Sequence, residues 1–255
     1  MTGRLLARGL LAGLLAGALA LAFALIWGEP HINAAIAIEE AQSAAEHLHG
    51  AATPAGHHHG DEEEELVSRA TQASWGLATG MLVHGAALGG LFALVFALVQ
   101  GRVATTGMRM TALLLALAGF VAITLVPQLK YPANPPAVGE GDTIGLRTAL
   151  FFAMLVLSIL TVVIGVAVAR RLRPLGAWRA GLAGTATWLA LTGAALLVLP
   201  TIDEVPPDFP AEVLHGFRLA TLGVQAILWA VLGLTFGLLA ERLLDGPPRR
   251  MALQH

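Results

Sequence analysis

Six long apolar segments without any Asp, Glu, Lys or Arg place the strongest constraint on how this chain folds. Crossing the hydrocarbon core of a bilayer takes about 20 residues of helix. Backbone amides inside lipid must be bonded within their own segment, and no run alternates like a barrel strand, so helices are expected. The sequence predicts an all-α, polytopic transmembrane helical bundle, with spans at Gly9–Gly28, Trp75–Val99, Met110–Leu129, Thr148–Ala169, Ala180–Leu199 and Leu219–Ala240.

The composition agrees with a membrane protein. Hydrophobic residues make up 56% of the chain and charged residues 13%, whereas soluble domains carry about 25% charged residues. We expect a single membrane domain over residues 1–255. The formal net charge of −2, without a basic stripe, excludes a nucleic-acid partner. Because the chain has no cysteine, any metal must be held by nitrogen, oxygen or thioether ligands.

The distribution of basic residues predicts the orientation, since Lys and Arg are retained on the cytoplasmic side in short loops. Three connections, at residues 29–74, 130–147 and 200–217, hold fifteen of the seventeen carboxylates and are predicted to lie outside. Both termini are then cytoplasmic, in a multi-pass protein of the inner (plasma) membrane. Eleven of the fifteen basic residues fit this arrangement, namely Arg4, Arg8, Arg102, Arg109, Arg170, Arg171, Arg173, Arg179, Arg242, Arg249 and Arg250.

The first span has an alternative interpretation as a cleaved signal peptide. Arg4 and Arg8 precede a Leu/Ala stretch that contains Ala-x-Ala triplets such as Ala18–Ala20. Retention is favoured because the apolar run is long and Gly9, Gly13 and Gly17 form a small-residue packing face. Cleavage would leave five spans and the same orientation for the others.

The loop at residues 29–74 is rich in metal-ligand side chains. His57, His58 and His59 stand just before five carboxylates in the run HHHGDEEEE. Imidazole suits borderline divalent cations and carboxylates add charge, so the run is interpreted as a cation trap of low specificity. A solvated acidic linker with incidental histidines is the alternative. Between Pro30 and Gly50, an Ala-, Ile- and Glu-rich stretch predicts a short helix at the membrane surface.

Two further groups are candidate metal ligands. In the last outer loop, Asp208, Glu212 and His215 follow at i, i+4 and i+7, and Glu-x-x-His is a spacing that helical metal sites use. Inside the second span, His84 follows one turn after Met81 and is predicted to line a path for the ion. The alternatives are helix-start and interfacial roles for the first group, and a neutral, hydrogen-bonded histidine for the second.

A weak internal repeat links the two Pro-rich loops, residues 130–147 and 200–217. Leu125–Leu150 resembles Leu197–Leu222, because each has a span-ending proline, a central Pro-Pro and an arginine that opens the next span. Parallel repeats occur in transporters, although convergent turn chemistry explains the likeness about as well. The chain lacks GxxxxGK[ST], HExxH and GxSxG motifs, so neither an ATP-driven motor nor a familiar hydrolase is indicated.

Three segments carry a resemblance to a known family. GEPHINAAIAIEEA, LVPQLKYPANPPAVGEGD and LPTIDEVPPDFPAEVLHGFRLATLGVQAILWAVLGLTFG together resemble the CbtA family of cobalt transporter subunits. The resemblance implies cobalt uptake linked to cobalamin supply, together with a small single-span CbtB subunit that bears histidines. The residues that carry it are Pro132, Asn134, Pro135, Pro136, Pro206, Phe209, Pro210, Phe217 and Arg218.

The leading hypothesis is therefore a subunit of a divalent metal uptake transporter, most simply for cobalt. The outer histidines and carboxylates would gather the ion, and His84 would line its path, without covalent chemistry or a resident cofactor. The alternative is a membrane scaffold or metal-delivery accessory that docks a transporter or an enzyme. A membrane enzyme is disfavoured because no span carries an Asp or Glu.

The absence of native cysteine allows a direct test of the orientation. Thr53→Cys should react with a membrane-impermeant maleimide in cells whose inner membrane is intact. Thr105→Cys should react only after that membrane is opened, because it lies in a predicted cytoplasmic loop. Labelling of Thr105→Cys in intact cells would reverse the assignment.

Overall fold

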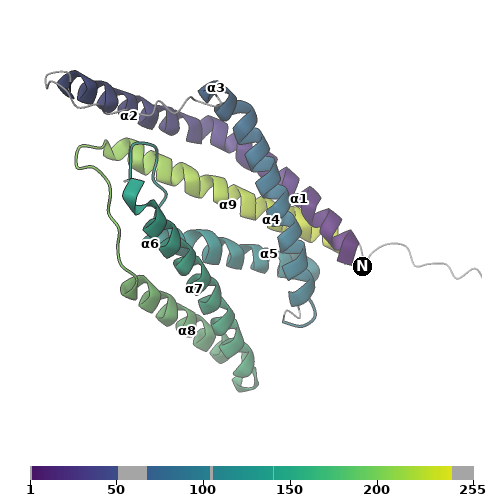
Figure 1. The fold of residues 1–255 in the computed structure, drawn as a ribbon. Helices are drawn as coiled ribbons and strands as arrows, with labels where there is room; N and C mark the ends of the chain where they lie inside the picture. Colours follow the sequence, from purple (N-terminus) through teal and green to yellow (C-terminus); the bar gives the residue numbers. More distant parts are fainter. Residues whose placement is uncertain (1, 51–67, 104–105, 140, 243–255) are drawn as a thin grey trace, which may run out of the picture. The chain divides into compact units, whose positions relative to one another are not determined.

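A computed structural model describes residues 2–50, 68–103, 106–139 and 141–242 of the chain. Within these ranges, six helices are long and apolar enough to cross a membrane, which confirms the six predicted spans (Figure 1). Their helical segments are Thr2–Ala45, Gln72–Val99, Met108–Lys130, Gly141–Arg171, Ala177–Val198 and Ala211–Glu241.

The described residues form helices and connecting loops and no β-strand. Three of the long helical segments include π-helical turns, at Ala24–Gly28, Gln72–Gly76 and Phe120–Leu125. Short 3₁₀ turns lie at Gly141–Thr143 and Arg173–Leu175. The α-helices are α1 (Thr2–Phe23), α2 (Glu29–Gly50), α3 (Arg69–Thr71), α4 (Leu77–Val99), α5 (Met108–Gly119), α6 (Val126–Lys130), α7 (Ile144–Arg171), α8 (Ala177–Val198) and α9 (Ala211–Glu241).

Two of the π-helical turns stand directly before a proline. Pro30 and Pro127 are the second residues of α2 and α6. Proline has no backbone N–H, and its ring clashes with the carbonyl of residue i−4 in a regular α-helix. The wider π turn gives that carbonyl more room, and the amides just before the prolines bond to residue i−5, Glu29 to Ala24 and Val126 to Val121.

The predicted helix between Pro30 and Gly50 is confirmed as a helix, but it continues the first span instead of starting separately. The π turn is the reason, because it accommodates Pro30 without ending the helix.

By its contacts the chain divides into two units, and whether it behaves as a single domain stays a prediction. Unit 1 comprises Met1–Leu21, Leu77–Leu117 and Ala226–His255. Unit 2 comprises Ala22–Gly76 and Ala118–Gln225. Each unit is described here by itself.

Unit 1 is held together by a glycine contact between α1 and α4, which lie side by side (Figure 1). The small-residue face predicted for the first span is confirmed. Cβ atoms placed on its three glycines would collide with backbone carbonyl oxygens of α4, in the pairs Gly9 with Gly89, Gly13 with Gly85 and Gly17 with Met81. In α9, Phe236 is fully buried and meets Phe92 and Phe96 of α4 edge to face.

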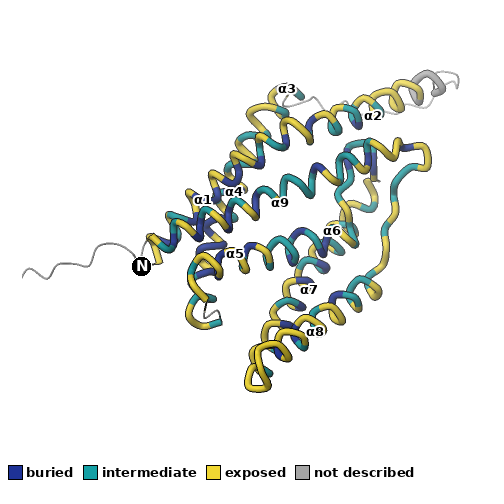
Figure 2. The backbone as a smooth tube through the Cα atoms, turned by 180° about the vertical axis from the view of Figure 1, so that it is seen from behind, coloured by how far each residue is buried: buried dark blue, intermediate teal, exposed yellow. Residues whose placement is uncertain are grey.

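Unit 2 contains the α7–α8 hairpin, which packs closely along its length. Gly165 and Gly184 let the two backbones approach, and the hydroxyls of Thr161 and Thr192 lie 3.1 Å apart. Most other side chains of the hairpin are exposed or half-buried (Figure 2). Because the exposed residues are largely apolar, this outward surface suits contact with lipid.

The glycine contact predicts a contrast between two substitutions in α4. Gly85→Ala should lower the thermal midpoint in detergent by several degrees, because its Cβ would press on the backbone of Gly17 at 2.9–3.1 Å and on the carbonyl of Gly13. Gly80→Ala should leave the midpoint unchanged or raise it slightly, because nothing lies within 4 Å of the added carbon. Equal midpoints for the two variants would contradict the close approach of α1 and α4.

Candidate functional site

A pocket of about 430 Å³ lies in unit 2, between the two Pro-rich loops and the helices beside them. Its wall combines apolar side chains with charged and amide groups, which is typical of a binding site for a small ligand. The lining residues are Gln128, Tyr131, Pro132, Ala133, Asn134, Val138, Arg147, Thr148, Phe151, Ile202, Asp203, Glu204, Val205 and Arg218.

Two arginines of the pocket each contact the opposite loop. Arg147, near the start of α7, donates through Nη1 to Glu204 Oε2 at 2.7 Å. Arg218, in the second turn of α9, donates through Nε to Ala133 O at 3.2 Å and through Nη2 to Asn134 Oδ1 at 2.9 Å. The arginine that follows each loop therefore fixes the position of the other loop.

These two contacts are related by the internal repeat. The prolines at 135 and 136, Gly145 and Arg147 recur 71 residues later as Pro206, Pro207, Gly216 and Arg218. At the same offset, Ala133 corresponds to Glu204. The contact of Arg147 with Glu204 is therefore the counterpart of the contact of Arg218 with Ala133. Reciprocal contacts of this kind are made by two copies that are related by a two-fold axis. It favours related hairpins over a chance likeness between two Pro-rich turns.

A second pair of polar contacts joins the loops beside the pocket. Lys130 Nζ donates to Thr201 Oγ1 at 3.0 Å. The phenol of Tyr131 donates to the carbonyl oxygen of Pro200 at 2.7 Å. Partial burial raises the pKa of Tyr131, which keeps the phenol a neutral hydrogen-bond donor.

An apolar cluster supports the loops. Val138 and Phe209, also 71 residues apart, are both buried with Ala35 of α2 and Leu214 of α9. The first loop turns sharply near this point, because Ala137 and Gly139 have φ angles of 65° and 125°. Left-handed values are uncommon for a residue with a Cβ such as Ala137.

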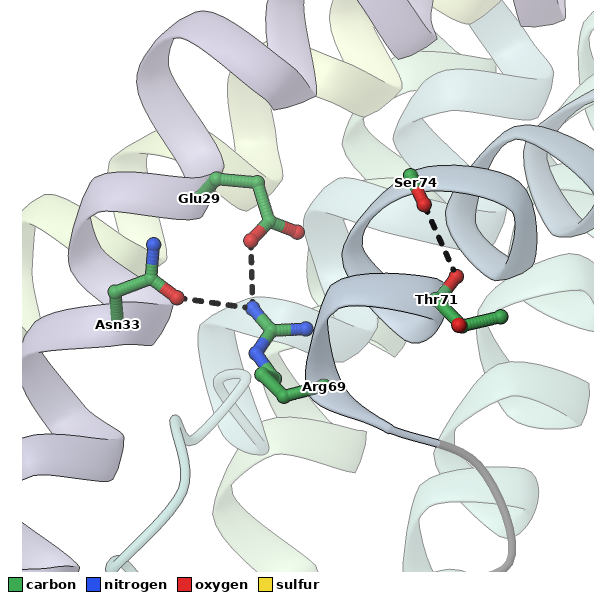
Figure 3. A network of polar contacts seen from close by, with 5 residues as sticks. All are labelled: Glu29, Asn33, Arg69, Thr71 and Ser74. Atoms are coloured by element: carbon green, nitrogen blue, oxygen red, sulfur yellow. Dashed lines mark hydrogen bonds and ion pairs between the residues drawn. The ribbon is translucent and has the colours of Figure 1, made fainter.

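A network of polar contacts at the ends of α2 and α3 also belongs to unit 2 (Figure 3). Arg69 Nη2 lies 2.6 Å from Glu29 Oε2 and 3.2 Å from Asn33 Oδ1, so it connects the first span to the start of the second. The Glu29 side chain is only 12% exposed. The sequence alone did not indicate this contact, because Arg69 and Glu29 are 40 residues apart.

The predicted ligands in the last loop do not converge. Within the described ranges, no group of three or more His, Asp or Glu side chains is placed to hold a metal. Asp208, Glu212 and His215 are all exposed, and the His215 ring bonds to the Ala211 carbonyl of its own helix at 2.6 Å. The expected helical spacing fails at Asp208 because α9 begins only at Ala211. His57, His58 and His59 lie outside the described residues.

His84 and Met81 lie in α4, as predicted. Met81 is half-buried, and its carbonyl oxygen faces Gly17 of α1. The His84 side chain is exposed within unit 1. Its role in conduction stays a prediction.

A family model described as probable cobalt transporter subunit (CbtA) matches residues 2–241. Searches of curated proteins and of solved structures gave no match.

The ion pair beneath the pocket predicts unequal effects of single and double substitution. The Glu204 side chain is only 8% exposed, so Arg147→Met should cost about 1–3 kcal/mol by taking the ion-pair partner from a buried carboxylate. Adding Glu204→Leu should restore part of the thermal midpoint, because the buried charge is removed as well.

The exposed pair of Arg109 and Glu241 supplies the control. Arg109 is 58% exposed, so Arg109→Met should cost less than about 1 kcal/mol. A lower thermal midpoint for the double variant Arg147→Met/Glu204→Leu than for Arg147→Met alone would contradict the buried ion pair.

Proposed function

The chain belongs to the CbtA family of probable cobalt transporter subunits, and we propose that it forms the membrane part of an uptake transporter for divalent metal, with cobalt as cargo. The observation that carries the proposal is the family match over nearly the whole chain, on a protein with six membrane-spanning helices. The family is one of transporter subunits and not of enzymes. We place the protein in the inner (plasma) membrane with both termini in the cytoplasm.

In this proposal the two Pro-rich loops form the entrance. Transporters with internal repeats bind their substrates where the repeats meet, and the pocket lies between two loops whose contacts are related by the repeat. The predicted outer run with His57, His58 and His59 gathers cations outside the membrane.

In this proposal another subunit completes the path beside His84, which is exposed within unit 1. A polar side chain that faces lipid is expensive, and intramembrane histidines generally face protein or water. His84 is flanked on one helix face by Gly80 and Ala87, which are exposed as well and leave room for a second helix. A small single-span subunit of the CbtB kind, bearing histidines, suits this face.

One other candidate function, from a different class, has the same outer histidines and carboxylates behind it. The chain would then be a non-transporting scaffold or metal-delivery accessory that docks a transporter or an enzyme. Reconstitution separates the two candidates, because the accessory would bind metal without flux across proteoliposomes. Flux of several divalent metals through the complete assembly would also identify the preferred cargo.

Cobalt accumulation in cells tests the proposal. Cells that express the chain with its partner should accumulate more cobalt than cells without it. His84→Ala should reduce accumulation severalfold, whereas Val83→Ala should not, because Val83 is a similarly exposed neighbour without a ligand atom. Unchanged accumulation both without the chain and with His84→Ala would end the proposal.

A further inference from the structure

The charge of Arg218 is the least compensated feature of the pocket. Its guanidinium is half-buried, and its hydrogen bonds go to a backbone carbonyl and an amide oxygen, which are both neutral. In the described part of the chain, Arg218 forms no ion pair. A guanidinium has five N–H donors, and the contacts to Ala133 and Asn134 use only some of them. Arg218 is therefore suited to bind an anionic oxygen group in the pocket.

The other charges of the wall leave this preference in place. Arg147 and Glu204 form an ion pair and largely cancel each other. Asp203 carries a negative charge without an ion pair among the described residues, but it is exposed, so solvent screens it more than the half-buried Arg218. A bare divalent cation in the pocket would be repelled by Arg218 and would meet no three-ligand group among the described residues.

The size of the pocket also exceeds the needs of a single ion. A divalent cation with six waters occupies roughly 200 Å³, at about 30 Å³ for each water. The pocket measures about 430 Å³, and its lining includes the apolar residues Val138, Phe151 and Ile202. A small organic molecule that carries the metal fills such a space better than a hydrated ion.

We propose that the pocket binds the metal as a small chelate with a free carboxylate, and that Arg218 recognises this carboxylate. The identity of the metal rests on the proposed function, whereas the preference for an anionic group rests on the pocket alone. A carboxylate can accept two parallel hydrogen bonds from a guanidinium, which gives geometric selectivity as well as attraction. Other anions, including lipid phosphates, can also accept hydrogen bonds from a guanidinium. The experiment distinguishes them from the chelate.

Equilibrium dialysis with the full chain in phosphatidylcholine nanodiscs tests the proposal. Radioactive cobalt is offered as cobalt citrate or as cobalt chloride, and labelled citrate is offered without metal. Cobalt citrate should bind at least about tenfold more tightly than cobalt chloride, and metal-free citrate should compete with it at Arg218, because it carries the same carboxylate. Arg218→Gln should weaken its binding about tenfold or more, and Arg218→Lys should restore part of it.

Lys130→Gln is the matched control, because it removes a cation of the same loops that does not line the pocket. It should change binding by less than about twofold, and all variants are compared only after their thermal midpoints are measured. Binding of cobalt chloride as tight as that of cobalt citrate would overturn the proposal. An unchanged affinity in Arg218→Gln would do the same.

Nanodiscs with added phosphatidylglycerol test whether a lipid headgroup binds in the pocket instead of the chelate. If this lipid displaces cobalt citrate through Arg218, the pocket is a headgroup site and the chelate assignment is wrong. Failure of the chelate to bind, with cobalt accumulation in cells still dependent on the chain, would leave the proposed function standing. If cobalt accumulation in cells does not depend on the chain, the proposed function is wrong. The binding of the citrate probes then tests the anion preference by itself.

Discussion

Every backbone N–H and C=O inside the bilayer has to find its hydrogen-bond partner within its own helix, and the rest of this structure depends on that constraint. It allows only helices in the six apolar segments. It also explains why Pro30 and Pro127 do not end their helices. Each follows a π-helical turn in which an amide reaches back to residue i−5, so the missing proline donor is accommodated by local rewinding.

The same environment removes the hydrophobic drive between helices, because lipid is as apolar as their side chains. Helices then associate through close backbone contact and through polar bonds. In unit 1 the close contact is made by glycines such as Gly13 and Gly85, and in unit 2 by Gly165 and Gly184. The polar bonds of unit 2 gather at the helix ends, where Arg147 and Arg218 connect the two Pro-rich loops.

The sequence predicted the spans well because the absence of charge over about 20 residues has a single physical meaning in a bilayer. The glycine face of the first span was predictable for the same reason, since small residues at every fourth position lie on one side of a helix. The contacts of Arg147 and Arg218 were not predictable, because each joins residues 57 or more positions apart. Whether His84 lines a path stays a prediction, because the tendency of intramembrane histidines to face protein or water describes complete assemblies and this sequence belongs to one subunit.

The two halves of the internal repeat differ at the position that matters most for the pocket. Arg147 meets the carboxylate of Glu204, whereas the counterpart of Glu204 is Ala133, which offers Arg218 only its backbone carbonyl. A symmetric pair would have neutralised both arginines. With alanine at 133, the two loops keep their reciprocal contacts while one guanidinium keeps its positive charge. The geometry of the repeat therefore holds the pocket in place, and the departure from the repeat gives the pocket its preference for an anion.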